Sequence, residues 1–149
     1  MKGTRLPEIT VEGPGGPVSL EALRGGRPLV VVFYVEEGTP TCTAELTAFR
    51  NDYALIEELG AVFVAISADP VERQAEFARA GGFPFLLLAD PELRAARAFG
   101  VADETGKRSL RAIFVSDREG VIVEAIPYYN PANPVQYQAV FTALGLSEA

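Results

Sequence analysis

The feature that most constrains the fold is a set of short, continuous apolar runs rich in β-branched residues. The first run, P-L-V-V-V-F-Y-V, covers residues 28–35, and the second, A-V-F-V-A-I-S, covers residues 61–67. A third covers residues 85–89. Apolar runs of this length without polar alternation are typical of strands buried on both faces. The sequence therefore predicts a central sheet that is covered on both sides.

Helical segments are expected between these runs. Thr39 and Pro40 predict the start of one helix, because threonine is a good N-cap and proline fits the first helical position. Apolar residues then recur at helical spacing up to Gly60. Asp-Pro and Asn-Pro pairs open three further expected helices, over about residues 69–80, 90–99 and 133–144. Residues 18–26 are expected to form a short helical segment after a turn.

The C-terminal third adds a hairpin. Two strands are expected at residues 110–116 and 121–126, on either side of the turn signal D-R-E-G. Strands that alternate with helices, followed by a hairpin, predict an α/β fold with a central mixed sheet flanked by helices. The chain has 149 residues. This length predicts a single domain over residues 1–149.

The composition narrows the partners. The formal net charge is −7, which argues against a nucleic-acid partner because phosphate binding needs basic patches. The N-terminal residues contain no apolar segment of the kind that signal peptides carry. The longest apolar run is too short to cross a membrane. We therefore expect no membrane partner and a location in the cytoplasm.

The residue counts also restrict the chemistry. The chain has no histidine and one cysteine. It therefore has neither an internal disulfide nor a Ser-His-Asp or Cys-His arrangement. A zinc site built from one cysteine and carboxylates is improbable. Any general base must be a carboxylate, an amine or the substrate itself.

The single cysteine, Cys42, falls at the third position of the helix expected after Thr39. Helix N-termini carry unpaired N–H groups and the positive end of the helix dipole, and both favour a thiolate, the reactive form of cysteine. Glu36 and Glu37 would oppose the thiolate if they folded close to it. A small, buried and inert cysteine is the alternative, and the position alone leaves both open.

The stretch T-P-T-C-T-A-E-L, residues 39–46, resembles the active-site motif of peroxiredoxins, the alkyl hydroperoxide reductase and thiol-specific antioxidant family. The closest match is the bacterioferritin comigratory protein branch, which typically shows T-P-G-C-T followed by Glu or Gln. Other stretches resemble the family in the same order over most of the chain, including I-S-A-D-P-V-E-R-Q-A-E-F and R-A-I-F-V-S-D-R-E-G-V-I. The resemblance implies a thioredoxin-like fold.

The resemblance also implies roles for three residues. Cys42 matches the peroxidatic cysteine. Thr39 matches the threonine whose hydroxyl forms hydrogen bonds near the thiolate and the peroxide. Arg111 matches the arginine that holds the thiolate and polarises the peroxide. A guanidinium is always charged and donates two hydrogen bonds at once, which suits this task. The resemblance implies a thiol peroxidase without metal, haem, flavin or other cofactor.

The implied cycle needs partners. Cys42 would reduce hydrogen peroxide or a small organic hydroperoxide and become a sulfenic acid. An external thiol would then recycle it through a mixed disulfide. This reductant would be thioredoxin-like, glutaredoxin-like or a low-molecular-weight thiol, and the protein would be a monomer or a homodimer.

The sequence departs from the family pattern at three positions. Val35 stands where the motif usually begins with a proline that shields the cysteine. Thr47 stands where this branch often has a resolving cysteine, so the cycle must use Cys42 alone. Thr41 replaces the glycine of T-P-G-C. The loss of the proline puts the rate of catalysis, or activity itself, in question.

Simpler interpretations apply to several polar and aromatic residues. Thr39 could be only an N-cap, and Arg111 could pair with a surface carboxylate. Glu45 is expected to interact with the helix dipole in the first turn of its helix. Tyr34 is expected to pack in the core. The remaining expectations are helix caps at Asp69 and Asp90 and cover for an apolar surface at Tyr128 and Tyr129.

Two other functions stay open. One is a peroxide sensor, in which sulfenylation of Cys42 alters binding to a partner. The other is a non-enzymatic protein of the same fold, with Val35 marking lost chemistry. A thiol–disulfide oxidoreductase fits least, because Thr39 occupies the position of the other cysteine in C-x-x-C.

Overall fold

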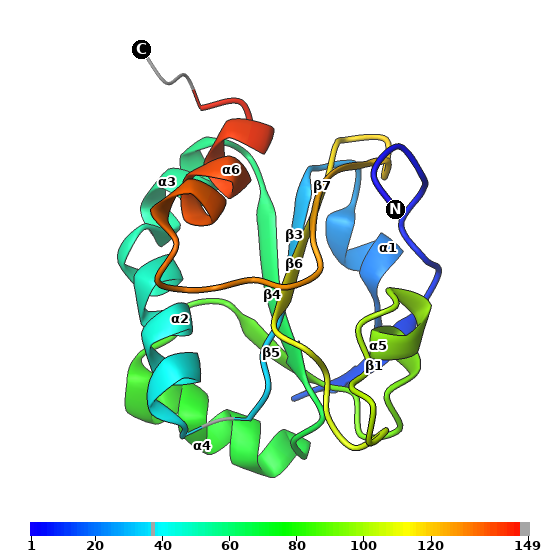
Figure 1. Ribbon diagram of the computed structural model, residues 1–149, viewed down its shortest axis with the longest axis vertical. Helices are drawn as coiled ribbons and strands as arrows, with labels where there is room; N and C mark the ends of the chain where they lie inside the picture. The colour runs from blue at the N-terminus through cyan, green and yellow to red at the C-terminus, as the bar shows by residue number, and fades with distance from the viewer. Residues whose placement is uncertain (37, 147–149) are drawn as a thin grey trace.

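The computed structural model describes residues 1–36 and 38–146, and shows one sheet between two layers of helices (Figure 1). The strands are β1 (Thr10–Gly13), β2 (Gly16–Ser19), β3 (Leu29–Phe33), β4 (Val62–Ser67), β5 (Leu86–Ala89), β6 (Ala112–Ser116) and β7 (Ile122–Ile126). The helices are α1 (Leu20–Arg24), α2 (Pro40–Asn51), α3 (Tyr53–Glu58), α4 (Val71–Gly81), α5 (Arg94–Ala98) and α6 (Pro134–Ala143).

The seven strands form one mixed sheet in the order β2-β1-β5-β4-β3-β6-β7. The neighbours β3, β4 and β5 run parallel, since helices connect them. Strand β6 pairs antiparallel with β3, and the β6–β7 hairpin continues that edge. The predicted α/β fold with a mixed sheet flanked by helices is confirmed.

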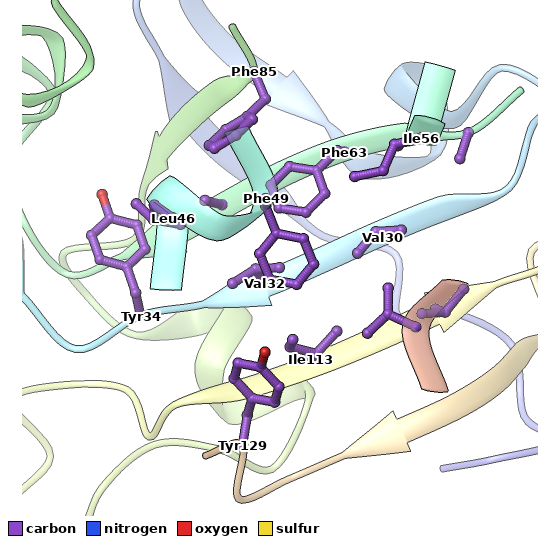
Figure 2. Packing of buried hydrophobic residues seen from close by; sticks show 14 of the residues in the cluster. Val30, Val32, Tyr34, Leu46, Phe49, Ile56, Phe63, Phe85, Ile113 and Tyr129 are labelled. Carbon is purple, nitrogen blue, oxygen red and sulfur yellow. The ribbon is translucent and has the colours of Figure 1, made fainter. Parts of the chain in front are cut away.

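The central strands divide their side chains between two cores. In β3, Val30 and Val32 point to the face covered by α2, α3, α4 and α6, while Leu29, Val31 and Phe33 point to the face covered by α1 and α5. This alternation follows from the two-residue period of a strand. Figure 2 shows Phe49 packed over Val32 on the first face. The continuous apolar run in the sequence therefore reflects burial on both faces.

Two predicted helices differ from the structure. Val18 belongs to β2, opposite Val11 of β1, and the helix predicted over residues 18–26 is only α1. Tertiary pairing with β1 decides this boundary. The helix predicted up to Gly60 is interrupted at Asp52 (φ −107°, ψ 13°), whose carboxylate accepts a hydrogen bond from the Tyr137 hydroxyl.

The predicted cap at Asn133 is right, because its side chain accepts hydrogen bonds from the first-turn amides of α6. Asp90 accepts from Ala95 and Ala96 of α5, but Leu93 holds the N-cap position and the helix begins at Arg94, later than predicted. The prediction that Asp69 is a helix cap is wrong. Pro70 occupies the N-cap position of α4, while the Asp69 carboxylate is buried and accepts the Ser67 hydroxyl.

Candidate active site

Cys42 is the third residue of α2, directly after the segment that leaves the carboxyl end of β3 (Figure 1). The helix begins at Pro40, as the sequence predicts. The Thr39 backbone is extended (φ −78°, ψ 145°), and its carbonyl accepts the Thr43 amide at 2.9 Å. Cys42 therefore lies in the first turn, at the positive end of the helix dipole.

Arg111 meets the sulfur from the neighbouring strand. The antiparallel register pairs Phe33 with Ala112, so the next residues, Tyr34 and Arg111, lie at the same end of the sheet as α2. The Arg111 Nη2 donates to Cys42 Sγ over 3.4 Å. The alternative in which Arg111 pairs only with a surface carboxylate is therefore wrong.

The surroundings of Cys42 favour its thiolate. Burial raises the pKa of the thiol, but the polar groups around the sulfur, including the Glu36 backbone, the Arg111 guanidinium and the Val35 backbone, lower it by more. The pKa of Cys42 is therefore lowered from its ordinary value. A lower pKa raises the fraction of the nucleophilic form near neutral pH.

Thr39 occupies the N-cap position but does not cap the helix with its side chain. Its hydroxyl donates to the Glu36 carbonyl at 3.0 Å. A hydroxyl has one proton, so that proton reaches the sulfur or a bound ligand only after the hydroxyl rotates. Thr39 thus holds the preceding segment through this hydrogen bond. It also lies where its rotated hydroxyl can donate to Cys42.

Cys42 shares one property with an inert structural cysteine: its side chain has no exposed surface. Its neighbours differ from those of such a cysteine, because a charged guanidinium and the start of a helix both face the sulfur. An inert cysteine in an apolar pocket has a raised pKa, whereas that of Cys42 is lowered.

Glu45 is a site residue that the sequence interpretation missed. The expectation that it belongs to first-turn electrostatics is wrong, because its side chain is buried and accepts Arg111 Nε at 3.2 Å on Oε1. Its Oε2 has no hydrogen-bond partner among the described residues. Burial and the Cys42 charge raise the pKa of Glu45 well above its usual value, although Arg111 opposes them. The three-residue spacing from Cys42, which puts both side chains on one helix face, was the available signal.

Two acidic residues, Glu36 and Glu37, precede the helix in the sequence, and they are expected to oppose the thiolate if they lie close to it. The Glu36 carboxylate pairs with Arg108 at 3.4 Å. Glu37 lies outside the described residues. The expected repulsion from Glu36 is therefore offset by a neighbouring arginine.

The tyrosines for which the sequence predicts a packing role differ in their burial. Tyr34 is in the core beneath α2, as expected (Figure 2). Tyr128 is 74% exposed, so the expectation that it covers an apolar surface is wrong. Tyr129 is itself buried in the core, and burial together with the charge of Glu45 raises its pKa.

Residues 1–36 and 38–146 contain no cluster of three or more cysteine or acidic side chains that could hold a metal ion. None of the helices in this part of the chain has the length and apolar character needed to span a bilayer. The contacts described above bring together the sulfur of Cys42, the guanidinium of Arg111, the hydroxyl of Thr39 and the carboxylate of Glu45.

Comparison with known proteins identifies the family of this chain. Residues 3–125 match the model of the AhpC/TSA family. The chain is 36% identical over 138 residues to the chloroplastic peroxiredoxin Q of Sedum lineare, covering 91% of this chain and 73% of the relative. It is 32% identical over 128 residues to peroxiredoxin Bcp of Bacillus subtilis, covering 82% of each chain.

A solved structure of a related protein has the same fold. Peroxidoxin BcpB from Mycobacterium tuberculosis superposes with a TM-score of 0.86 at 30% identity, covering 96% of this chain and 95% of that chain. The family match over residues 3–125 includes Cys42 and strands β1 to β6. The chain therefore belongs to the AhpC/TSA family and is a peroxiredoxin of the bacterioferritin comigratory protein branch, a thiol-dependent peroxidase.

Proposed function

We propose that Cys42 is the peroxidatic residue of a single-cysteine cycle. The thiolate attacks the terminal oxygen of a hydroperoxide, an S–O bond forms, and the O–O bond breaks. Cys42 is oxidised to the sulfenic acid, and the departing oxygen takes up a proton and leaves as water or an alcohol. The observation that carries this proposal is the 3.4 Å contact between Arg111 Nη2 and Cys42 Sγ in the first turn of α2.

Each site residue has a role in this step. Arg111 holds the thiolate and stabilises the negative charge that develops on the departing oxygen. Thr39 donates its hydroxyl proton to the bound peroxide after rotating away from Glu36. Glu45 is a positioning residue, because it accepts the Arg111 Nε and so orients the guanidinium toward Cys42.

The burial of the sulfur supports a small substrate. Cys42 has no exposed side-chain surface, so a bulky hydroperoxide would need a larger opening than hydrogen peroxide or a short alkyl hydroperoxide. We therefore infer that small peroxides are the substrates.

The recycling step needs a second molecule. The chain has one cysteine, so a thiol from outside must attack the sulfenic acid, release water and form a mixed disulfide. A second thiol then releases Cys42 and leaves the reductant as a disulfide. The reductant is thioredoxin-like, glutaredoxin-like or a low-molecular-weight thiol. The cytoplasmic location and the monomer or homodimer stay predictions.

Turnover with defined reductants tests the proposal. Purified protein is mixed with hydrogen peroxide or a small alkyl hydroperoxide and with each class of thiol, and peroxide loss is followed beside Cys42→Ser. We expect catalytic peroxide loss with at least one thiol and none in the variant. Fast oxidation without turnover on any thiol would favour the peroxide sensor, and an unreactive Cys42 would favour the non-enzymatic alternative.

A further inference from the structure

Residues 108–111 lie along the segment that joins β3 to α2, and three of their side chains contact it or Cys42. Arg108 pairs with Glu36, the Ser109 hydroxyl donates to the Tyr34 carbonyl at 3.0 Å, and Arg111 donates to Cys42. The proposed chemistry uses only Arg111. The contact made by Arg108 therefore needs a separate explanation.

Arg108 joins two carboxylates that are distant in sequence. Its Nη2 lies 3.4 Å from Glu36 Oε1 and its Nη1 lies 3.4 Å from Asp69 Oδ1. The Asp69 side chain is 1% exposed, and one of its oxygens accepts the Ser67 hydroxyl at 2.9 Å. Because Asp69 is fixed after β4, the bridge has a rigid anchor and differs from an ordinary surface ion pair.

Glu36 is the second carboxylate that Arg108 contacts, and its backbone contacts a residue of the site. Its carbonyl accepts the Thr39 hydroxyl at 3.0 Å. The backbones of Glu36 and Val35 are also among the groups that lower the pKa of Cys42. Glu36 thus contacts Arg108 through its side chain and Thr39 through its backbone carbonyl.

We propose that Arg108 is a positioning residue for the reaction of Cys42: it ties Glu36 to Asp69, holds in place the Glu36 carbonyl that accepts the Thr39 hydroxyl, and keeps the Glu36 carboxylate paired. This inference rests on the proposed function of Cys42. The bridge also acts next to Val35, where the resemblance leads one to expect a proline. Valine leaves φ free where proline would fix it, so the bridge restrains a segment that lacks that constraint.

The first test compares Arg108→Gln with Arg73→Gln. Arg73 is the matched control, because it also faces Asp69, at 3.9 Å, but from α4 and on a 53% exposed side chain. The measurements are the rate of Cys42 oxidation by hydrogen peroxide and the ultraviolet absorbance of the thiolate against pH. We expect Arg108→Gln to slow oxidation by about three- to tenfold and to raise the pH at which the thiolate forms. Arg73→Gln should stay within about twofold of the unmodified protein.

Two further measurements separate positioning from a general loss of structure. Arg108→Lys keeps the charge and should recover part of the lost rate, while melting curves check that each variant is folded. In a Glu36→Gln background, Arg108→Gln should change the rate by less than about twofold, since its partner is already absent. High salt should slow the unmodified protein toward the rate of Arg108→Gln and leave that variant almost unchanged.

The failures of the two proposals are distinguishable. If Cys42 of the unmodified protein reacts no faster than a free thiol, the proposed function fails and this inference fails with it. If Cys42 reacts fast and Arg111→Ala is slow, but folded Arg108→Gln matches the unmodified protein, only the role of Arg108 is overturned. Equal losses in Arg108→Gln and Arg73→Gln would also overturn it.

Discussion

Helices α2 and α6 begin with the same sequence device and use it differently. Each starts with a polar residue followed by proline, Thr39-Pro40 and Asn133-Pro134. Asn133 accepts the amides of Val135 and Gln136 at 2.9 and 3.3 Å, which closes the start of α6. The Thr39 side chain makes no capping hydrogen bond.

The difference shows where a helix start is available for an anion. In α6 the asparagine side chain satisfies first-turn donors, so that terminus is structural. In α2 the hydroxyl is directed to Glu36, and Cys42 lies in the first turn beside Arg111. In α2 the cap residue thus turns away from its own helix beside Cys42, the proposed nucleophile.

The largest expected effect is the removal of the guanidinium at the start of α2. Arg111→Ala should slow the oxidation of Cys42 by hydrogen peroxide by about a hundred- to a thousandfold, because it removes the donor for both the thiolate and the departing oxygen. Stopped-flow kinetics on the reduced protein would measure this. Arg97→Ala on α5 is the control, and an equal loss in that variant would contradict the assignment.

The buried carboxylate of Glu45 has no counterpart in α6, whose sequence contains no acidic residue. The pKa of Glu45 is raised in the folded state. The unfolded chain therefore loses the proton first as pH rises. Stability should fall from about pH 4.3 upward, at up to ~1.4 kcal/mol per pH unit, until the folded state also ionises.

Glu45→Gln cannot ionise, so it should gain stability relative to the unmodified protein over the same pH range. Denaturant unfolding of both proteins at several pH values would measure the difference. A difference that does not change with pH would show that Glu45 titrates alike in both states.

Removal of the hydroxyl at the start of α2 should have a smaller effect on the rate. Thr39→Ala should slow Cys42 oxidation by about tenfold, since the Glu36 carbonyl and the peroxide both lose a donor. Thr39→Ser keeps the hydroxyl and should stay near the unmodified rate. Equal rates in all three proteins would reduce Thr39 to a backbone position.

The smallest expected effect is on α6, and it concerns stability. Asn133→Ala should lower the free energy of unfolding by about 1 kcal/mol and leave the oxidation rate unchanged, because its cap is structural. Thermal and denaturant unfolding would measure the loss. A slower reaction of Cys42 in this variant would break the distinction between the two helix starts.

Much of the fold could be predicted from local pattern. The apolar runs gave β3 and β4, and the cap-and-proline pairs located the starts of α2 and α6. The prediction failed where distant residues decide the outcome. Val18 is in a strand because it pairs with Val11 of β1, and the helix breaks at Asp52, where Tyr137 of α6 donates to the carboxylate.

The site residues also divide into those that the sequence predicted and those that depend on distant partners. The resemblance pointed to Cys42, Thr39 and Arg111, and the antiparallel register of β3 and β6 explains how Arg111 reaches the sulfur. Glu45 and Arg108 were missed, because their importance comes from burial and from partners on other elements. For Glu45 the three-residue spacing from Cys42 was the only local signal, and the pairing of Arg108 with Glu36 and Asp69 had none.

The central claim is that the start of α2 holds Cys42 as a reactive thiolate. The most direct test is the rate at which hydrogen peroxide oxidises Cys42 in the reduced protein, measured against pH by intact mass with a sulfenic-acid trap. The account predicts a rate orders of magnitude above that of free cysteine near neutral pH, and a midpoint at lower pH than that of an ordinary thiol. A rate equal to that of free cysteine, with an ordinary thiol midpoint, would contradict it.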